Sequence, residues 1–319
     1  MAKSVAFPRK EGVLYLAEGG TETELMYRHG HELREFAAFE LMKKPQAVED
    51  MTGMYRRYLD VAAKHGMAVL LAGVDYRASP DWAEKLGYSP AELADLQAKC
   101  IDFLRDVSAP YKADLPDIAI VGGIGPRGDA YQLNAEITAE SAEEYHAVQI
   151  ATLKECGVDL VWAATINNIP EAVGIARATA EAGLPLNLSF ALDSTHKLKS
   201  GPSLKEAVEA VDAEAGDARP DGYGINCSHP FEFEPALEPG DWAQRIRSLR
   251  PNAAAMDKVS LCRLGHIEEG DPEELGQLMG DLARRYPNVD IWGGCCGTWD
   301  KHFDRIAHYV RAARETVPA

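Results

Sequence analysis

Short apolar segments alternate with longer amphipathic segments along the whole chain. The short segments have the apolar, β-branched composition of strands that are buried on both faces, as in a parallel sheet. We expect strands at residues 12–20, 67–73, 117–125, 158–165, 184–192, 222–228, 252–260 and 289–297.

The longer segments between these strands carry apolar residues at helical spacing. The clearest helices are expected at 143–157, at 169–183, after Ser203 and at 302–317. Ser203 is followed three residues later by Glu206, which is the pattern of a capping box at a helix start. Strand and helix patterns therefore alternate without a break.

An unbroken series of strand–helix units predicts an α/β fold with a parallel sheet, either doubly wound or closed into a barrel. Eight such units within 319 residues favour the (β/α)8 TIM barrel. The sequence contains no Gly/Ser linker, low-complexity tract or sharp change of composition. We therefore expect residues 1–319 to form a single barrel domain.

The composition limits the classes of partner. The chain is 46% hydrophobic and has 33 basic and 50 acidic side chains, which gives a formal net charge of −17. This balance argues against a nucleic-acid or anionic-membrane partner, since both need a positive face. No segment reaches the ~18 consecutive apolar residues of a membrane span, and the N-terminus lacks the apolar core of a secretory signal. We expect a cytoplasmic protein with small-molecule partners; a homo-oligomer is left open.

Three of the six cysteines follow predicted strands. Cys227 lies at the end of the sixth strand, in GINCSHP, and Cys295 and Cys296 lie at the end of the eighth, in GGCCGT. In a (β/α)8 barrel the carboxyl ends of all strands open on one rim, where active sites lie. The three thiols are therefore expected to meet over the barrel mouth.

Cys295 and Cys296 are neighbours in the chain, and neighbours on a regular strand point to opposite faces. Both thiols can face one metal only if the backbone leaves strand geometry there. Glycine accepts positive φ and close approach, so the surrounding glycines supply that freedom. These glycines are Gly293, Gly294 and Gly297.

Zinc suits three convergent thiolates, because it accepts them at tetrahedral positions and leaves one position open in catalytic centres. The alternative interpretation is three buried cysteines that pack as small apolar residues. His229 is a candidate fourth ligand, but Pro230 follows it and a solvated or capping role fits it better. The remaining cysteines fall on helical or loop patterns and are expected to be structural: Cys100, Cys156 and Cys262.

Motifs along nearly the whole chain resemble one family. The cysteine motifs GINCSHP and GGCCGT, the opening GGTETEL (19–25), the loop GGIGPRGDAY (122–131) and the stretch ending in TINNIPEA (145–172) are similar to motifs of the homocysteine S-methyltransferase family. That family includes the betaine-dependent enzymes and the homocysteine domain of methionine synthase. The cysteine motifs are the most specific part of the resemblance.

The resemblance implies an activity. In the family three cysteines bind zinc, which falls on Cys227, Cys295 and Cys296 here. Homocysteine occupies the open zinc position as a thiolate, because zinc lowers the pKa of the thiol. The thiolate attacks a methyl group carried on sulfur, nitrogen or a folate. A chain of 319 residues has no room for a cobalamin or folate module, which implies a freely diffusing donor such as S-methylmethionine, S-adenosylmethionine or a betaine.

The sequence departs from the family where the substrate amine is held. Ala164 stands where the family usually has Glu, and Ala72 stands where close relatives often have one. Glu18 replaces an Asp after the first strand. An α-ammonium group in a pocket needs a paired anion or several acceptors, and Glu18 and Asp75 are the candidates. If neither reaches it, the acceptor is another small thiol or a methylated sulfur or nitrogen compound.

Other residues are expected near the substrate. The backbone N–H groups of Gly19, Gly20 and Thr21 are candidates to bind a substrate carboxylate, or form an ordinary turn. Tyr76 is expected to contact the substrate or the metal. Asn226 is expected to orient substrate or neighbouring groups, or to tie the barrel rim.

Two other functions fit a zinc site with three cysteines. A zinc hydrolase would activate water, although hydrolytic sites favour His and carboxylate ligands and three thiolates leave zinc less Lewis acidic. A non-catalytic zinc-binding barrel would carry a fourth Cys or His that closes the tetrahedron. An open coordination position is therefore the feature that favours catalysis.

Overall fold

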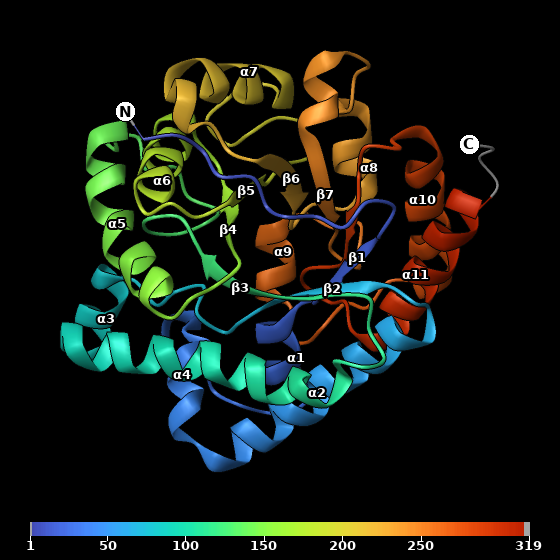
Figure 1. The fold of residues 1–319 in the computed structure, drawn as a ribbon, viewed down its shortest axis with the longest axis horizontal. Helices are drawn as coiled ribbons and strands as arrows, with labels where there is room; N and C mark the ends of the chain where they lie inside the picture. Colours follow the sequence, from blue (N-terminus) through green and yellow to red (C-terminus); the bar gives the residue numbers. More distant parts are fainter. Residues whose placement is uncertain (1, 316–319) are drawn as a thin grey trace.

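Eight parallel strands close into a barrel in which each strand pairs with its neighbours in chain order and β8 pairs with β1 (Figure 1). The structure is a computed structural model that describes residues 2–315, apart from the side chains of Val259 and Cys262. The strands are β1 (Tyr15–Ala17), β2 (Ala68–Ala72), β3 (Ile118–Ile124), β4 (Leu160–Ile166), β5 (Leu186–Phe190), β6 (Gly222–Asn226), β7 (Ile246–Arg250) and β8 (Ile291–Trp292).

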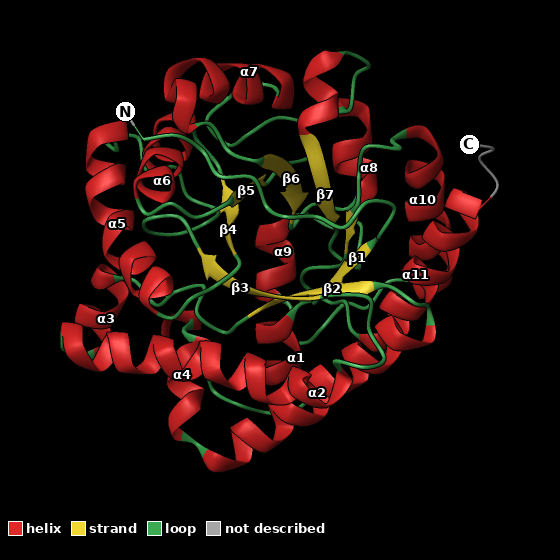
Figure 2. Ribbon diagram, in the orientation of Figure 1, coloured by secondary structure: helices red, strands yellow, loops and turns green. Residues whose placement is uncertain are grey.

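Helices surround the strands, as Figure 2 shows. They are α1 (Thr21–Tyr27), α2 (Pro45–Lys64), α3 (Pro80–Leu86), α4 (Pro90–Ser108), α5 (Ala139–Glu155), α6 (Ile169–Glu181), α7 (Leu204–Ala215), α8 (Pro230–Phe233), α9 (Lys258–Arg263), α10 (Pro272–Arg285) and α11 (Asp300–Glu315). The predicted TIM barrel is confirmed. The capping box before α7 is confirmed too, since the Ser203 hydroxyl accepts from the Glu206 N–H at 3.2 Å. The last two residues of the helix predicted at 302–317 lie outside the described residues.

The prediction of a seventh strand at 252–260 is wrong. The strand β7 ends at Arg250, and Lys258 begins the helix α9. Arg247 and Arg250 make the sequence of this strand polar, so the apolar pattern did not predict a strand there. Both charges are paired, Arg247 with Asp290 at the partly exposed edge of the strand and Arg250 with Glu18 in the interior, so the strand packs into the barrel in spite of its composition.

The interior of the barrel is filled by side chains rather than by a channel. A cluster of buried apolar residues occupies it, and the strands contribute Tyr15, Leu70, Leu160 and Ile291 among others. The N-terminal segment adds Phe7, whose ring contacts that of Tyr15 edge-on with centroids 5.8 Å apart. A second, larger cluster lies between the strands and the helices. Packing at the amino end leaves the carboxyl ends of the strands as the place for a site.

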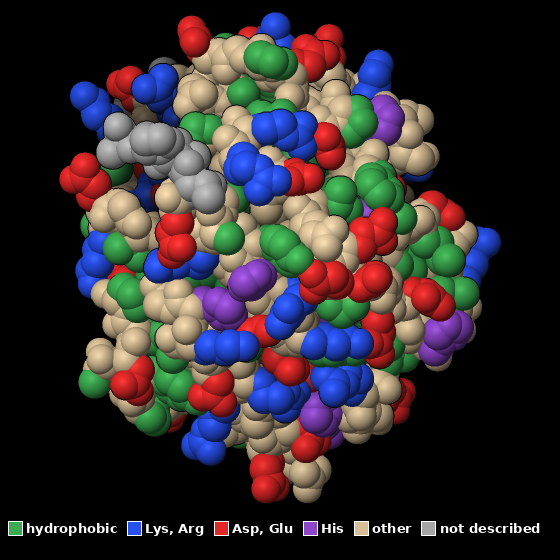
Figure 3. All heavy atoms as spheres, turned by 90° about the vertical axis from the view of Figure 1, so that its right-hand side faces the viewer, with side chains coloured by type: hydrophobic (Ala, Val, Ile, Leu, Met, Phe, Trp, Pro, Cys, Tyr) green, Lys and Arg blue, Asp and Glu red, His purple; other side chains and the backbone are tan. Residues whose placement is uncertain are grey.

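Acidic and basic side chains are interspersed on the face shown in Figure 3. Ion pairs also join neighbouring helices, as between Lys64 of α2 and Asp304 of α11 at 2.5 Å. The net negative charge is therefore not gathered into one patch on this face. Within residues 2–315, no helix combines the length and the apolar character needed to span a membrane.

Candidate metal and substrate site

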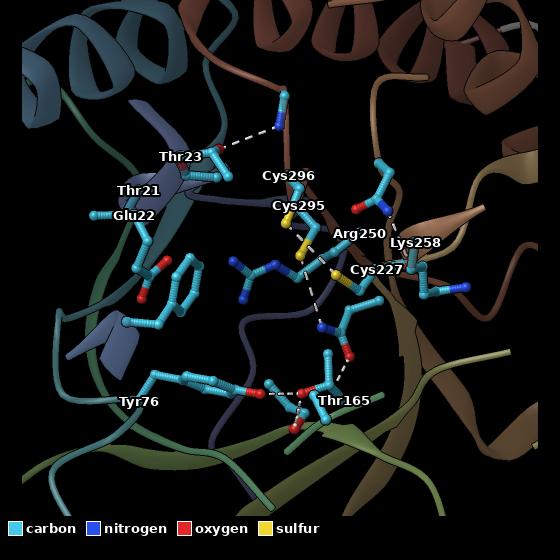
Figure 4. Close-up of a pocket in the computed structure, with 18 of the residues that line it drawn as sticks. Thr21, Glu22, Thr23, Tyr76, Thr165, Cys227, Arg250, Lys258, Cys295 and Cys296 are labelled. Atoms are coloured by element: carbon cyan, nitrogen blue, oxygen red, sulfur yellow. Dashed lines mark hydrogen bonds between the residues drawn. The ribbon is translucent and has the colours of Figure 1, made fainter. Parts of the chain in front are cut away.

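Three thiols meet at the carboxyl end of the barrel. Cys227 directly follows β6, and Cys295 and Cys296 follow β8. The sulfur atoms of Cys227 and Cys296 are 3.7 Å apart, and all three sulfur atoms lie within 4.8 Å of one another (Figure 4). The meeting of the three thiols at the barrel mouth, predicted from the sequence, is confirmed.

The backbone leaves strand geometry where the thiols converge. Cys227 itself has a φ of 56°, in the left-handed region that side chains rarely adopt, and Gly297 has a φ of 80°. Gly293 and Gly294 keep ordinary φ values and act through close approach instead. A Cβ atom on Gly294 would overlap the Thr298 side chain, and one on Gly293 would lie 2.9 Å from the carbonyl oxygen of Ala17 in β1. Gly297 thus supplies a positive φ, whereas Gly293 and Gly294 leave room for close packing.

Polar side chains hold the sulfur atoms in place. The Tyr131 hydroxyl lies 3.1 Å from the Cys227 sulfur. The Asn226 side-chain N–H₂ points to the Cys295 sulfur at 3.8 Å, while its oxygen accepts from the Thr165 N–H at 2.8 Å. Thr165 has a φ of 57° at an irregularity between β4 and β5, which turns its N–H toward Asn226.

The three thiols shift one another's pKa values. Hydrogen bonds from Cys295, Cys296 and Tyr131 lower the pKa of Cys227 well below its ordinary value. Interaction with the Cys227 sulfur raises the pKa of Cys295 to about 12, and raises that of Cys296 as well. A cluster of this kind gains most from a cation that replaces the shared protons.

The cluster fits a thiophilic metal. Zinc–sulfur bonds of about 2.3 Å in tetrahedral geometry put two sulfur atoms roughly 3.8 Å apart. The 3.7 Å separation of the Cys227 and Cys296 sulfur atoms matches that spacing. Among the residues whose side chains the structure describes, the cluster has three Cys, His, Asp or Glu members and no fourth. A metal held by the three thiols would therefore lack a fourth ligand from the Cys, His, Asp and Glu side chains that the structure describes.

The thiols line a pocket of about 300 Å³ between α1, α9 and the strand ends. Five aromatic side chains line it: Tyr27, Phe36, Tyr76, Tyr131 and Trp162. The helix α9 is fixed beside the pocket by Lys258, whose ammonium group donates to the Leu192 carbonyl oxygen and to Glu232. In Figure 1, α9 falls inside the ring of strands, whereas α1 lies just below β2 in the view.

Glu18 lies at this site but its charge is already paired. One carboxylate oxygen forms an ion pair with Arg250, and the other accepts from the Ala72 N–H at 2.9 Å. Arg250 also donates to the Gly294 carbonyl oxygen at 3.3 Å, and its guanidinium group stacks on Trp162 with 3.5 Å to the ring centroid. The pair therefore ties the ends of β1, β7 and β8 together under the cysteines.

Two of the backbone N–H groups after β1 that were candidates to bind a substrate carboxylate already donate hydrogen bonds within the protein. The Gly20 N–H donates to the Thr298 carbonyl oxygen at 3.2 Å, and the Thr21 N–H donates to the Gly19 carbonyl oxygen at 3.0 Å. A Cβ atom on Gly20 would lie 2.7 Å from the Cys295 carbonyl oxygen. These residues line the pocket and let the turn pack against the cysteine loop.

Asp75 and Tyr76 are placed differently from each other. The Asp75 side chain is fully buried behind the pocket wall, where both oxygens accept from the Gly123 N–H at 3.2 Å. Burial raises the pKa of Asp75 to about 7. Tyr76 lines the pocket, and its hydroxyl bonds to the Thr165 hydroxyl rather than to a sulfur atom.

His229 caps a helix. It precedes α8, and its ring nitrogen Nδ1 accepts from the Phe231 N–H at 3.3 Å. Burial lowers the pKa of His229 to about 4, which keeps the ring neutral. The expectation of a capping role is confirmed. Of the other cysteines, Cys100 is fully buried, Cys156 ends α5, and the Cys262 side chain lies outside what the structure describes.

Three residues of the site were missed by sequence reasoning. Tyr131 closes the motif at 122–131, and that position was a usable signal. Arg250 was assigned to no strand, so its side chain could not be placed. Glu22 looked like an ordinary acidic residue in the first turn of a helix, yet it is half-buried and lines the pocket.

A (β/α)8 barrel with three convergent thiols on its open rim defines a class of barrel proteins equipped to hold a thiophilic metal. Comparison with protein families matches residues 15–310 to the model of the homocysteine S-methyltransferases. The chain belongs to the homocysteine S-methyltransferase family and is a transferase.

Individual relatives are distant. The chain is 25% identical over 230 residues to the homocysteine S-methyltransferase of Escherichia coli (strain K12), covering 68% of this chain and 70% of that protein. It is 24% identical over 249 residues to the selenocysteine Se-methyltransferase of Brassica oleracea var. italica, covering 71% and 68%. The crystal structure of the Escherichia coli homocysteine methyltransferase MmuM in its metallated form superimposes with a TM-score of 0.70 at 21% identity, covering 94% of this chain and 96% of that one.

Proposed function

We propose that the protein transfers a methyl group from a small, freely diffusing donor to the thiol of homocysteine, with zinc held by Cys227, Cys295 and Cys296. The observation that carries the proposal is the convergence of three sulfur atoms on one pocket wall. The existence of a metallated form of the Escherichia coli methyltransferase, which has the same fold, supports a metal-dependent site in this chain. When bound, zinc would lower the pKa of the acceptor thiol and so supply a thiolate at neutral pH.

The protein's own residues would then orient the cluster and exclude water. Tyr131 and Asn226 contact two of the sulfur atoms and fix their directions. The pocket walls are rich in aromatic rings, which attract a sulfonium or quaternary ammonium donor by cation–π interaction. Holding donor and acceptor in line supplies much of the rate, because it removes the entropy cost of their encounter.

The transfer itself balances simply. The acceptor sulfur forms a bond to the methyl carbon while the methyl–sulfur or methyl–nitrogen bond of the onium donor breaks. The leaving atom keeps that electron pair and becomes neutral, and the proton of the acceptor thiol passes to solvent. No side chain needs to act as a general base on the sulfur when its pKa is lowered by the metal.

A selenol is the second candidate acceptor. The chain is as similar to a selenocysteine Se-methyltransferase as it is to a homocysteine S-methyltransferase, at 24% and 25% identity. Selenols are deprotonated more readily than thiols, so a site that activates one also accepts the other.

The cytoplasmic location expected from the sequence agrees with a cluster of free thiols, which needs a reducing compartment.

The experiment is incubation of zinc-loaded protein with homocysteine or selenocysteine and each of three donors: S-methylmethionine, S-adenosylmethionine and glycine betaine. Mass spectrometry then detects the methylated product. We expect turnover with homocysteine and one donor, and none in the Cys296→Ser variant. Zinc-loaded protein that methylates neither acceptor with any of these donors would contradict the proposal.

A further inference from the structure

The carboxylates around the pocket differ in whether their charge is free. Glu18 is 4% exposed and is neutralised by Arg250. Asp75 is fully buried, accepts from the Gly123 N–H, and lies outside the pocket lining. Neither carboxylate proposed from the sequence is therefore available to pair with a cationic group of a substrate.

Glu22 is different. It lies in the first turn of α1, and its half-buried side chain lines the pocket that contains the three thiols. Among the described residues, its carboxylate forms no ion pair and accepts no hydrogen bond from another residue. Figure 4 shows Glu22 and Arg250 extending from opposite walls toward the same space, with the cysteines beside them.

The free protein therefore holds an unpaired carboxylate in a partly desolvated place. Burial raises the pKa of Glu22 to about 7. An unpaired carboxylate at such a position is costly unless a cation reaches it. A substrate cation would offset this cost and would be held more strongly than on the open surface.

We propose that Glu22 binds the α-ammonium group of the acceptor, in place of the carboxylates that Ala72 and Ala164 do not provide. This inference rests on the proposed function, since it takes an amino-acid thiol as the acceptor. With the thiol at the cysteine cluster, the amino-acid end of the substrate lies in the remaining pocket, where Glu22 carries the free negative charge. Glu22 is thus a specificity residue that selects thiols bearing an ammonium group.

The test compares two acceptors that differ only in the ammonium group: homocysteine and its des-amino analogue, γ-mercaptobutyrate. Their affinities for zinc-loaded protein are measured by calorimetry without any methyl donor, and KM values are measured with the active donor. We expect Glu22→Gln to weaken homocysteine binding by about 10- to 100-fold, the range of one charge-assisted hydrogen bond. Affinity for γ-mercaptobutyrate and the KM of the donor should change less than about twofold.

The controls separate charge from folding. Glu32→Gln removes a charge from an exposed side chain away from the pocket lining and should leave both affinities unchanged. Glu22→Asp keeps the charge and should retain part of the preference for homocysteine. Equal weakening of both thiols in Glu22→Gln, or a rise in the donor KM alone, would overturn the assignment. Because the binding measurement needs no turnover, failure of the methyl transfer proposal would be seen separately.

Discussion

Arg250 at the end of β7 and Glu18 after β1 form a buried ion pair directly beneath the three cysteines, with both side chains about 5% exposed or less. The guanidinium group also donates to the carbonyl oxygens of Glu18 and Gly294, so it joins the carboxyl ends of β7, β8 and β1. The pair is therefore both an electrostatic and a mechanical part of the site. It explains why a carboxylate beside the pocket does not by itself provide a substrate anchor.

Breaking this pair should be costly. Arg250→Met leaves the Glu18 carboxylate buried without its partner, so we expect a loss of about 3–5 kcal/mol in the free energy of unfolding. The double variant with Glu18→Gln removes both charges and should lose less than the sum of the single variants. Urea unfolding measures all three. Lys85→Met, which breaks the exposed Lys85–Glu35 pair, should cost less than about 1 kcal/mol. Additive single effects would show that the two charges are not coupled.

The Tyr131 hydroxyl should matter for metal affinity. It lies within hydrogen-bond distance of the Cys227 sulfur, at 3.1 Å, and removal of a hydrogen bond to a metal ligand typically lowers metal affinity by about 10- to 100-fold. We expect Tyr131→Phe to fall in that range in a competition titration with a chelator. Tyr145→Phe is the matched control, because its hydroxyl donates to the Ser79 hydroxyl instead. Equal zinc affinity in both variants would contradict a role of the Tyr131 hydroxyl in metal binding.

Asp75 should make stability depend on pH. Its pKa is raised from 3.8 to about 7 in the folded protein, mainly by burial. Between these values the unfolded state binds fewer protons than the folded state, so stability falls as pH rises. The Asp75→Asn variant, whose side-chain oxygen can still accept from the Gly123 N–H, should lack this fall, which amounts to at most about 4 kcal/mol. Urea unfolding from pH 4 to pH 8 measures how the free energy of unfolding changes with pH. The same pH dependence in the wild type and in Asp75→Asn would contradict the account.

The close packing at Gly294 should be needed for metal binding. A Cβ atom there overlaps Thr298, so Gly294→Ala must displace the loop that carries Cys295 and Cys296. We expect a loss of about 1–3 kcal/mol in stability and a marked loss of bound zinc. Gly53→Ala is the control. Gly53 lies within α2, and a Cβ atom added there would have the Arg57 side chain at 3.9 Å as its nearest contact, so the substitution should be neutral or slightly stabilising. Full zinc content in Gly294→Ala would show that the loop tolerates the displacement.

The sequence was sufficient for the barrel and for the cysteine cluster. Apolar strands marked seven of the eight positions, and the rule that strand ends share one rim brought Cys227 to Cys295 and Cys296. The strand β7 was missed because pairing of its arginines is a tertiary property that no local pattern records. The ion pair of Glu18 could not be predicted either, because its partner Arg250 is distant in the chain.

Glu22 shows a further limit of local patterns. An acidic residue in the first turn of a helix is common, and its sequence context does not distinguish an exposed carboxylate from one turned into a pocket. Only the packing of α1 over the strand ends makes that difference. The cysteines were predictable because their chemistry and spacing are unusual, whereas Glu22 became a candidate only when its neighbours were known.

The zinc content of the purified protein tests the central claim most directly. Metal analysis of the wild-type protein, Cys296→Ser and the control Cys156→Ser, whose thiol lies at the end of α5 outside the cluster, gives the number of zinc ions per chain. The account predicts one zinc ion per chain in the wild type and in Cys156→Ser, and little or none in Cys296→Ser. Wild-type protein without zinc after zinc loading, or full zinc content in Cys296→Ser, would contradict it.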